Sequence, residues 1–498
     1  MSSYLEEQSH IQRRRRKRWV LGAVLAWWVG TAAWHTNKPM PAGTDVAAPA
    51  VAVSSEQVRF LYDLTYADAF GRPHHEQRIF DEVFRIIDEA GSFIVVDFFL
   101  VNELMGASGG VHRALSRQLV DRLVARKKTD PQLVILFITD PINNVYGGMS
   151  SALLGELRSA GIDVVITDLE ALRDSNLLYS PFWRTFVQWW GNSAEEGWMP
   201  NPFAPHSQIT LRSWLALLNF KANHRKVVVA DRQDKTLTAL VTSANPHDAS
   251  SAHSNVALRV DGPTARHILE SEMALAQFSG WRGHIYADNA DEPDPQEGNA
   301  ATLQFVTEEA IRDHLLREIG ATRSGDSISI ATFYLADRKV IEGLLAAAAR
   351  NVRVRLILDS NRDAFGRQKD GVPNRPVANE LVTESDGAIE VRWYRTHGEQ
   401  FHTKLALIAR GDQVIASLGS ANLTRRNLGN YNLEANLAVA ASSTSALAQQ
   451  MQSYFDRLWN NEGPPGTEYT APFGAFQDAD RARYWRYRLM EASGLSTF

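Results

Sequence analysis

A short apolar stretch, SFIVVDFFLV at residues 92–101, has a counterpart in SISIATFYLA at residues 327–336. Each run is rich in β-branched and aromatic residues, which is typical of a buried strand. The ordered repetition of five such segments indicates an internal duplication of the chain. The other four pairs are LVILFITD (133–140) with VRVRLILD (352–359), GIDVVITD (161–168) with GAIEVRWY (387–394), NHRKVVVA (223–230) with FHTKLALI (401–408), and VTSAN (241–245) with LGSAN (418–422).

Segments with helical periodicity lie between the predicted strands of each half. They span residues 80–90 and 111–125 in the first half, and 308–319 and 338–349 in the second. Strands that alternate with helices predict an α/β domain. We therefore expect two α/β/α sandwich domains in tandem, related by a pseudo-two-fold axis, with a shared site at their interface.

The domain boundaries follow from changes in composition along the chain. The two predicted domains occupy residues 56–286 and 302–462. The acidic, proline-containing segment 287–301 is expected to link them, and residues 463–498 form a C-terminal extension. Before the first domain we predict a basic segment, a transmembrane signal anchor and a Pro/Ala-rich linker, at residues 1–18, 19–36 and 37–55.

The N-terminal segment combines a basic cluster, Arg13–Arg18, with the uncharged run WVLGAVLAWWVGTAAW at Trp19–Trp34. A spanning helix needs about 20 apolar residues, so this run is short. If it spans a membrane, the basic cluster stays in the cytoplasm. The main body then lies outside a bacterial-type inner membrane, in the periplasm. A cleaved signal peptide and a buried helix of a soluble protein are the alternatives.

The first half contains an additional aromatic segment, roughly residues 172–220. Aromatic side chains at this density suit contact with lipid headgroups and acyl chains. An ordinary aromatic core beneath a long loop is the alternative. Its aromatic residues are Phe182, Trp183, Phe186, Trp189, Trp190, Trp198, Phe203, Trp214 and Phe220.

Composition and charge exclude several classes of function. The chain has no cysteine, so thiol catalysis, thiolate metal sites and disulfides are excluded. Its net charge is −5, but residues 1–18 carry a net +4, which leaves −9 for the rest. Nucleic-acid-binding domains usually carry a strong basic excess, so a nucleic-acid partner is not expected.

In each half a histidine and a lysine two residues apart begin an apolar run. The pairs are His224 with Lys226, and His402 with Lys404. Residues i and i+2 of a strand point to the same face, so each strand presents an imidazole beside an ammonium group. One such pair carries little information, but two at matching places in a duplicated body indicate a functional site. A Ser-Ala-Asn triplet follows at a similar distance in both halves and supplies Ser243, Asn245, Ser420 and Asn422.

Two imidazoles, two ammonium groups and two amides around one pocket suit phosphodiester chemistry. One neutral imidazole can attack phosphorus and form a covalent phosphohistidine. The other can protonate the leaving alkoxide and then accept a proton from incoming water or alcohol. The lysines and asparagines can stabilise charge on the phosphoryl oxygens, and the two serines are predicted to bind substrate. We expect this chemistry to need neither a metal ion nor a cofactor.

These residues resemble the phospholipase D superfamily, whose signature is His-x-Lys-x4-Asp followed by Gly/Ser-x-Asn. The resemblance covers about residues 56–462. It implies that His224, in the N-terminal half, is the nucleophile and that His402 acts as acid and base, although the two roles could be exchanged. The overall layout is similar to that of bacterial cardiolipin synthases and related membrane-associated members.

The two halves depart from the signature in different ways. The first half keeps the motif aspartate, Asp231, whereas the second has Ala409 at that position. Further on, Glu434 resembles the family's glutamate that orients a catalytic histidine, and Asn255 stands at the equivalent place in the first half. The resemblance thus leaves one acidic partner in each half. A carboxylate on the far ring nitrogen fixes the tautomer and supports the imidazolium.

Three functions remain open from the sequence. A membrane-anchored phosphatidyltransferase or phospholipase D acting on a phospholipid is favoured, because the anchor would place the pocket beside its substrate. A nuclease or other phosphodiesterase would use the same chemistry, and a degenerate phosphate-binding protein is suggested by Ala409 and Asn255. A long basic groove around the histidines would favour nucleic acid, and an apolar-rimmed tunnel would favour lipid. The sequence is silent on oligomeric state.

Overall fold

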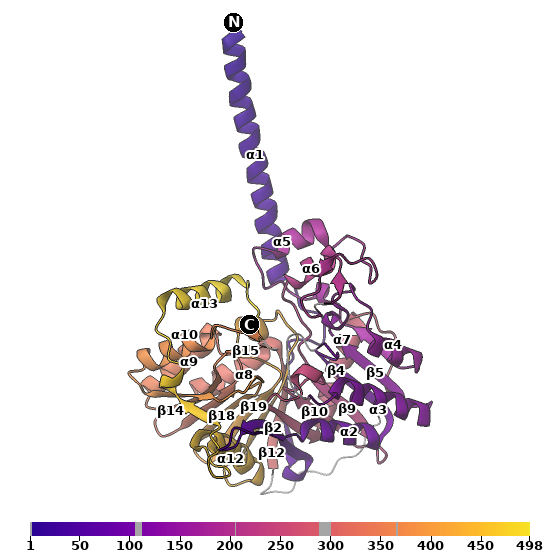
Figure 1. The fold of residues 1–498 in the computed structure, drawn as a ribbon, viewed down its shortest axis with the longest axis vertical. Coiled ribbons are helices and arrows are strands. Elements are labelled where there is room, and N and C mark those ends of the chain that lie inside the picture. The colour runs from indigo at the N-terminus through magenta and orange to yellow at the C-terminus, as the bar shows by residue number, and fades with distance from the viewer. Residues whose placement is uncertain (1, 105–111, 205, 288–299, 365–366) are drawn as a thin grey trace.

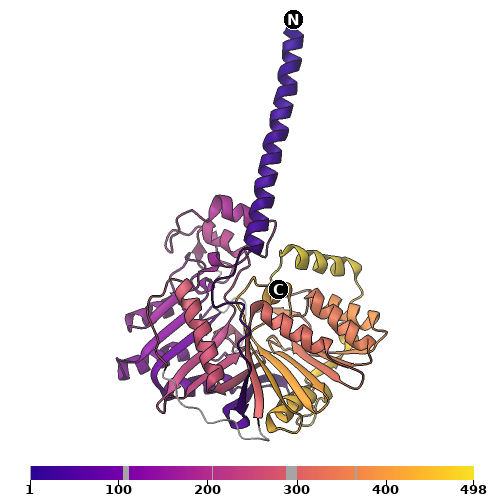
Figure 2. The ribbon, with the colours of Figure 1, turned by 180° about the vertical axis from the view of Figure 1, so that it is seen from behind.

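The computed structural model describes residues 2–104, 112–204, 206–287, 300–364 and 367–498. Its body contains two large mixed sheets that lie beside each other (Figures 1 and 2). The first sheet has the order β3 (Pro73–Glu76), β2 (Val58–Ala67), β11 (Asn255–Asp261), β10 (Leu237–Thr242), β9 (Lys226–Arg232), β4 (Ala90–Phe98), β5 (Val134–Thr139) and β6 (Asp163–Ile166). The second has the order β1 (Val51–Ser54), β12 (Ala300–Thr307), β20 (Ala435–Ser442), β19 (Gln413–Gly419), β18 (Lys404–Arg410), β13 (Ser327–Thr332), β14 (Arg353–Asp359), β17 (Ile389–Tyr394) and β21 (Thr470–Pro472).

The order of the strands confirms the predicted duplication. The run β2-β11-β10-β9-β4-β5-β6 of the first sheet repeats as β12-β20-β19-β18-β13-β14-β17 in the second. In both sheets the last three of these strands are parallel and the others pair antiparallel. The tandem α/β fold expected from the sequence is therefore confirmed.

Helices cover the outer face of each sheet. The first sheet packs against α2 (Ile79–Glu89), α3 (Leu115–Thr129) and α4 (Ala152–Ser159), which bury one apolar core with it. The second packs in the same way against α8 (Glu308–Gly320), α9 (Arg338–Ala349) and α10 (Asn374–Glu384).

A third apolar core joins the two halves. It contains Val256 of β11, Leu418 of β19 and Leu437 of β20. The helices α7 (Pro263–Phe278) and α12 (Ala446–Asn460) also bury side chains in this core. Because apolar burial at the contact is continuous, the two sheets are held as one body.

Two segments outside the predicted domains add strands to the second sheet. Residues 51–54 of the expected linker form β1, which pairs with β12, and residues 470–472 of the C-terminal extension form β21. A segment that precedes the first domain in the sequence therefore forms a strand of the second domain's sheet. The expected connection at 287–301 lies almost entirely outside the described residues.

Helix α1 spans Ser2–Asn37 and extends away from the body (Figure 1). Its C-terminal end is held by Asp174, whose N–H donates to the His35 carbonyl at 2.9 Å. Among the helices of the described ranges, none has an apolar stretch long enough to cross a membrane. The expected transmembrane anchor at 19–36 is therefore not supported, since its uncharged run is short and follows directly on a basic cluster. The predicted periplasmic location of the main body depended on that anchor and therefore has no support either.

Candidate active site

The histidines of the two His-x-Lys pairs line one cavity although they come from different halves of the chain, and the two lysines are buried behind the cavity lining. His224 and His402 both line a cavity of about 690 Å³. Each histidine lies two residues before the start of its strand, β9 or β18, and the residue before each histidine forms a parallel bridge to the opposite half. Asn223 bridges Leu433, and Phe401 bridges Ser254. These two equivalent bridges bring the start of each motif strand against the other domain.

Each imidazole is held through Nδ1 by a residue from the other half. Nδ1 of His224 lies 2.9–3.0 Å from the carboxylate oxygens of Glu434. Nδ1 of His402 lies 3.1 Å from Oδ1 of Asn255. Both acceptors favour the tautomer with a proton on Nδ1, which leaves Nε2 as a free lone pair. The prediction that Glu434 orients a histidine agrees with this geometry.

The serines of the Ser-x-Asn triplets lie behind these partners. Ser243 Oγ donates to Asn255 Oδ1 at 2.9 Å, and Ser420 Oγ donates to the carboxylate of Glu434. Both serines are fully buried, and neither is among the residues that line the cavity. Both serines therefore contact the groups that hold the imidazoles, and their predicted substrate-binding role stays a prediction.

Asp231 lies away from the imidazoles. Its carboxylate accepts from the N–H groups of Ser92 and Phe93 at 2.8 and 3.0 Å, and from Ser92 Oγ at 2.7 Å. It is five residues beyond Lys226 on an extended strand, a separation of roughly 17 Å. Asp231 thus connects β9 to the start of β4, and the expected role of an acidic partner in the first half is not fulfilled. Because this contact is structural, Ala409 in the second half does not remove a group from the cavity.

The two lysines are buried beneath their own histidines. Lys226 Nζ donates to the carbonyl of His224 at 2.5 Å, and Lys404 Nζ donates to that of His402 at 3.0 Å. Each ammonium also lies over an aromatic ring, 5.1 Å from Phe99 in the first half and 5.6 Å from Phe333 in the second. Burial lowers the pKa of Lys226 to about 7 and the pKa of Lys404 well below its usual value.

Burial also lowers the pKa of both histidines. The pKa of His224 falls to about 4 despite the opposing effect of Glu434, and that of His402 falls well below its usual value with Lys404 adding to the effect of burial. Burial alone would raise the pKa of Glu434, but His224 and Lys226 more than offset it and keep the carboxylate ionised. The rings are therefore neutral at pH 7, as a nucleophilic imidazole requires.

Both predicted asparagines line the cavity. Asn245 Oδ1 accepts from the N–H of Leu100 at 3.3 Å, which leaves its amide N–H₂ group for a ligand. The buried Oδ1 of Asn422 has no hydrogen-bond partner among the described residues. Rotation of the side-chain amide by half a turn exchanges the two ends, so Asn422 can present either a donor or an acceptor.

Two buried aspartates position the motif strands, a role that sequence reasoning missed. The N–H of Asn223 donates to Asp140 at 2.7 Å, and the N–H of Phe401 donates to Asp359 at 2.8 Å. Burial raises the pKa of each aspartate to about 7. The signal in the sequence was their equal place at the end of the second strand of each repeat.

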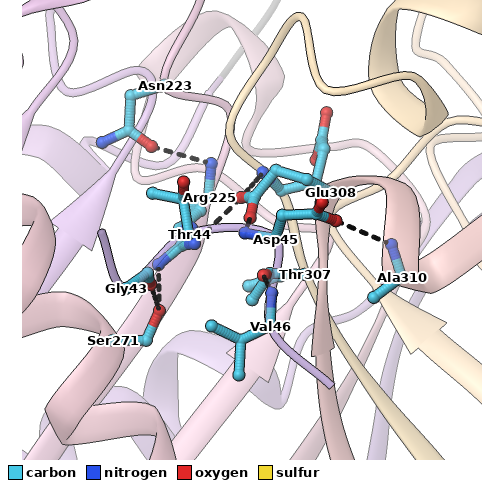
Figure 3. Close-up of polar contacts among 12 residues, drawn as sticks. Gly43, Thr44, Asp45, Val46, Asn223, Arg225, Ser271, Thr307, Glu308 and Ala310 are labelled. Atoms are coloured by element: carbon cyan, nitrogen blue, oxygen red, sulfur yellow. Dashed lines mark hydrogen bonds and ion pairs between the residues drawn. The ribbon is translucent and has the colours of Figure 1, made fainter. Parts of the chain in front are cut away.

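Arg225, between the first histidine and lysine, is fully buried and joins the two halves (Figure 3). Its guanidinium donates to Glu308 at 2.9 Å and to Glu272 at 3.2 Å. Glu308 also accepts from the N–H of Glu434 at 2.9 Å and from that of Asp45 at 2.6 Å. One carboxylate therefore connects the first motif strand, the second half and the segment that follows α1.

The cavity is lined by both polar and apolar residues, and we call the apolar ones together its apolar side. Beside the histidines and asparagines, Arg426 and Lys369 line it, and burial lowers the pKa of Arg426 to about 10. The aromatic segment 172–220 contributes much of the apolar side, including residues of α6 (Leu211–Leu217). Apolar lining residues from all parts of the chain are Phe99, Leu100, Leu104, Ile142, Tyr146, Pro202, Phe203, Trp214, Leu217, Leu218, Phe220, Ala222, Phe333, Tyr334 and Phe498.

Comparisons with known proteins agree with this architecture. Residues 315–459 match the family model described as cardiolipin synthase, PLD-like domain. The solved phosphatidylserine synthase of Haemophilus influenzae Rd KW20 is similar over 93% of this chain and 99% of its own, with 11% identity and a TM-score of 0.54. At such identity the likeness concerns the fold alone.

Two further solved structures are similar at lower scores. The polyphosphate kinase of Porphyromonas gingivalis covers 88% of this chain with 54% of its own, at 13% identity and a TM-score of 0.46. Nuc of Salmonella typhimurium, a phospholipase D family member, covers 32% of this chain with 95% of its own, at 19% identity and a TM-score of 0.25. No curated protein sequence matches the chain. The second half of the chain is thus similar to a cardiolipin synthase, PLD-like domain, and the histidines of both His-x-Lys pairs line one cavity.

Proposed function

We propose that the protein transfers or hydrolyses the phosphodiester of a phospholipid through a covalent phosphohistidine. The observation that carries the proposal is that His224 and His402, from different halves, line one cavity while their Nδ1 atoms are held from behind. A bound phosphodiester would therefore meet one Nε2 from each half. Two imidazoles on one phosphorus are what double displacement needs, because one attacks and the other handles protons.

In the first step His224 Nε2 attacks phosphorus, and the bond to the departing alkoxide breaks. His402 donates the proton that the alkoxide requires. The pKa of His402 is low in the buried site, so it must gain this proton as the anionic substrate binds, because a nearby negative charge favours the imidazolium. Lys226, Lys404, Asn245 and Asn422 stabilise charge on the phosphoryl oxygens.

In the second step water or an alcohol gives a proton to His402 and attacks the phosphohistidine. The bond between phosphorus and His224 then breaks, and both imidazoles return to their starting state. Water makes the protein a phospholipase D, and an alcohol such as a second lipid headgroup makes it a phosphatidyltransferase. The groups that act are imidazoles, ammonium groups and amides, and the proposal includes no metal ion.

The cavity favours a phospholipid over nucleic acid. Its apolar side, with Trp214, Leu217 and Phe220, suits acyl chains rather than a polyanionic backbone. A nucleic-acid site would need a basic groove that follows many phosphates. The family model described as cardiolipin synthase supports the same choice.

Turnover of lipid tests the proposal directly. Purified protein in detergent would receive phosphatidylglycerol, alone or with phosphatidylethanolamine or glycerol, beside a His224→Ala control. We expect cardiolipin or phosphatidic acid that is absent with the variant. If folded protein produces neither, the lipid proposal fails, and single-stranded DNA would be the next substrate.

A diester with a good leaving group tests the roles of the two histidines. Release of p-nitrophenolate from bis(p-nitrophenyl) phosphate needs no protonation, so His402→Ala should still give a burst and then stall as a phosphoprotein. His224→Ala should give no burst. Mass spectrometry would locate the phosphoryl group on His224, whereas a burst only with the His224 variant would reverse the assignment.

A further inference from the structure

Several large apolar side chains are exposed on two neighbouring elements. In the aromatic segment, π-helical η4 (Trp183–Val187) is followed by exposed tryptophans, and Trp189 is 75% exposed. On helix α13 (Arg481–Ser493), Trp485 is 65% exposed and Leu489 is 68% exposed. We name the exposed Phe186, Trp189, Trp190, Trp485 and Leu489 the aromatic face. Exposed aromatic clusters of this kind mark interaction surfaces.

The aromatic segment and α13 lie at one end of the molecule. In both views of the ribbon they lie at the end from which α1 leaves the body (Figures 1 and 2). They are also connected directly, since the N–H of Leu177 donates to the carbonyl of Ser493 at 3.3 Å. The two halves of the chain therefore contribute to the same end.

The cavity extends to this end of the molecule. Trp214 and Leu217, on α6 of the aromatic segment, line it together with Phe498, five residues beyond the end of α13. The same cavity contains both histidines. An apolar chain that enters near the aromatic face thus has apolar contacts on the way to the imidazoles.

The outer side of α13 combines aromatic and basic residues. Arg481, Trp485 and Leu489 are exposed and spaced by four, so they lie on one side of the helix. Arg486 is also exposed and pairs with Asp370. Tryptophan is favoured at the level of lipid headgroups, and arginine beside it is attracted to anionic lipid.

We propose that the aromatic face docks on the surface of a phospholipid bilayer that contains anionic lipid, with the cavity opening towards it. The inference rests on the proposed function in that the bilayer also supplies the substrate. It adds the surface by which the substrate reaches the site and the orientation of the body on the membrane.

Because the chain has no cysteine, single cysteines can be labelled without background. Full-length Trp189→Cys and Trp485→Cys would carry an environment-sensitive fluorophore and be mixed with vesicles of phosphatidylglycerol and phosphatidylethanolamine. The matched control is Gln450→Cys, an exposed position on α12, which lies at the opposite end (Figure 1). We expect a several-fold rise in emission, with quenching by lipid-borne spin labels, at 189 and 485 but not at 450. No change at 189 and 485, or an equal change at 450, would overturn the proposal.

A second measurement separates docking from chemistry. The double variant Trp189→Ser and Trp485→Ser should turn over vesicle lipid roughly tenfold more slowly, because interfacial apolar burial is lost. It should hydrolyse bis(p-nitrophenyl) phosphate at the unchanged rate, since neither residue lines the cavity. Equal turnover of vesicle lipid would contradict docking. Vesicle binding without any lipid turnover would contradict the proposed function but would still support docking through the aromatic face.

Discussion

At the residue scale, the two histidines differ in the group that holds them. His224 has the carboxylate of Glu434 behind its ring, whereas His402 has the neutral amide of Asn255. A carboxylate stabilises an imidazolium and an amide oxygen does so only weakly. The geometry therefore suits His224 as the group that carries positive charge in a phosphohistidine. His402 depends on the bound substrate for its proton.

Asn255→Asp should give His402 the carboxylate that His224 already has. The pKa of His402 should rise, so the histidine should keep its proton to higher pH. The alkaline limb of the kcat/KM profile should then move upwards by about one pH unit or more. Asn460→Asp makes the same charge change at an exposed site and should leave the profile unchanged. An unmoved limb in the Asn255 variant would show that His402 is not the acid.

The buried lysines predict that anion binding takes up protons. The pKa of Lys226 is about 7 without an anion, and a bound phosphate monoester or diester should raise it. The affinity for the anion should then be highest below pH 7 and should fall as the pH rises through that value. The fall is up to tenfold per pH unit for each proton that binding takes up. Dibutyl phosphate is a suitable ligand because its own charge stays constant in this range.

Titration calorimetry of dibutyl phosphate in buffers of different ionisation enthalpy would measure the proton uptake. Lys226→Met should reduce the number of protons taken up and flatten the dependence of affinity on pH. Affinity that stays constant across neutral pH would rule out lysine protonation as part of binding.

At the element scale, three segments meet at the first residue of α8. Glu308 has a φ of 47°, in the left-handed region that a non-glycine residue occupies only when its surroundings hold it there. Its carboxylate accepts from Arg225, just before β9, and from the N–H of Asp45 (Figure 3). It also accepts from the N–H of Glu434. The start of α8 therefore fixes the strand that carries His224 and the residue that orients it.

Glu308→Ala should destabilise the fold strongly. It removes one of the two carboxylates around buried Arg225, a kind of change that costs about 3–5 kcal/mol. Glu390→Ala is the control, because its carboxylate pairs with Arg353 on the surface, where the two side chains are 49% and 62% exposed and such pairs contribute about 0–1 kcal/mol. Urea unfolding followed by circular dichroism measures both. Similar losses of unfolding free energy in the two variants would show that the contact with Arg225 contributes no more than a surface ion pair.

At the scale of the whole molecule, three parts of the chain line the cavity. The two halves supply one imidazole each, and the aromatic segment of the first half supplies much of the apolar side. The core shared by both sheets holds these parts in fixed relation. The two similar domains therefore form one cavity whose apolar lining comes in part from a segment of the first half alone.

Leu217→Asp should impair turnover of long-chain lipid selectively. Loss of one apolar side chain from the acyl contact costs about 1.5–3 kcal/mol, or roughly 10–160-fold in kcat/KM. Hydrolysis of bis(p-nitrophenyl) phosphate should remain unchanged. Leu178→Asp, at a 60% exposed leucine outside the cavity, is the control in the same detergent assay. If Leu217→Asp slowed the turnover of both substrates equally, the acyl chains would not contact Leu217.

The sequence by itself determined the duplication, the strands and the His-x-Lys pairs. These features are local, because strand residues alternate between two faces and a repeated pattern predicts a repeated unit. Glu434 was also predicted, through the resemblance to a family glutamate that orients a catalytic histidine. The anchor predicted at 19–36 is not supported, because among the described residues no helix has an apolar stretch long enough to cross a membrane.

Only the tertiary structure decided which residues meet. Glu434 and His224 are 210 positions apart, and Asn255 and His402 are 147 apart. Such contacts depend on how two sheets pack and on the register of their strands, which no local pattern encodes. For the same reason Asp231, five residues along β9, lies far from the cavity, and Ser243 and Ser420 lie behind the ring partners. Their chemistry was readable from the sequence, but their roles followed from packing.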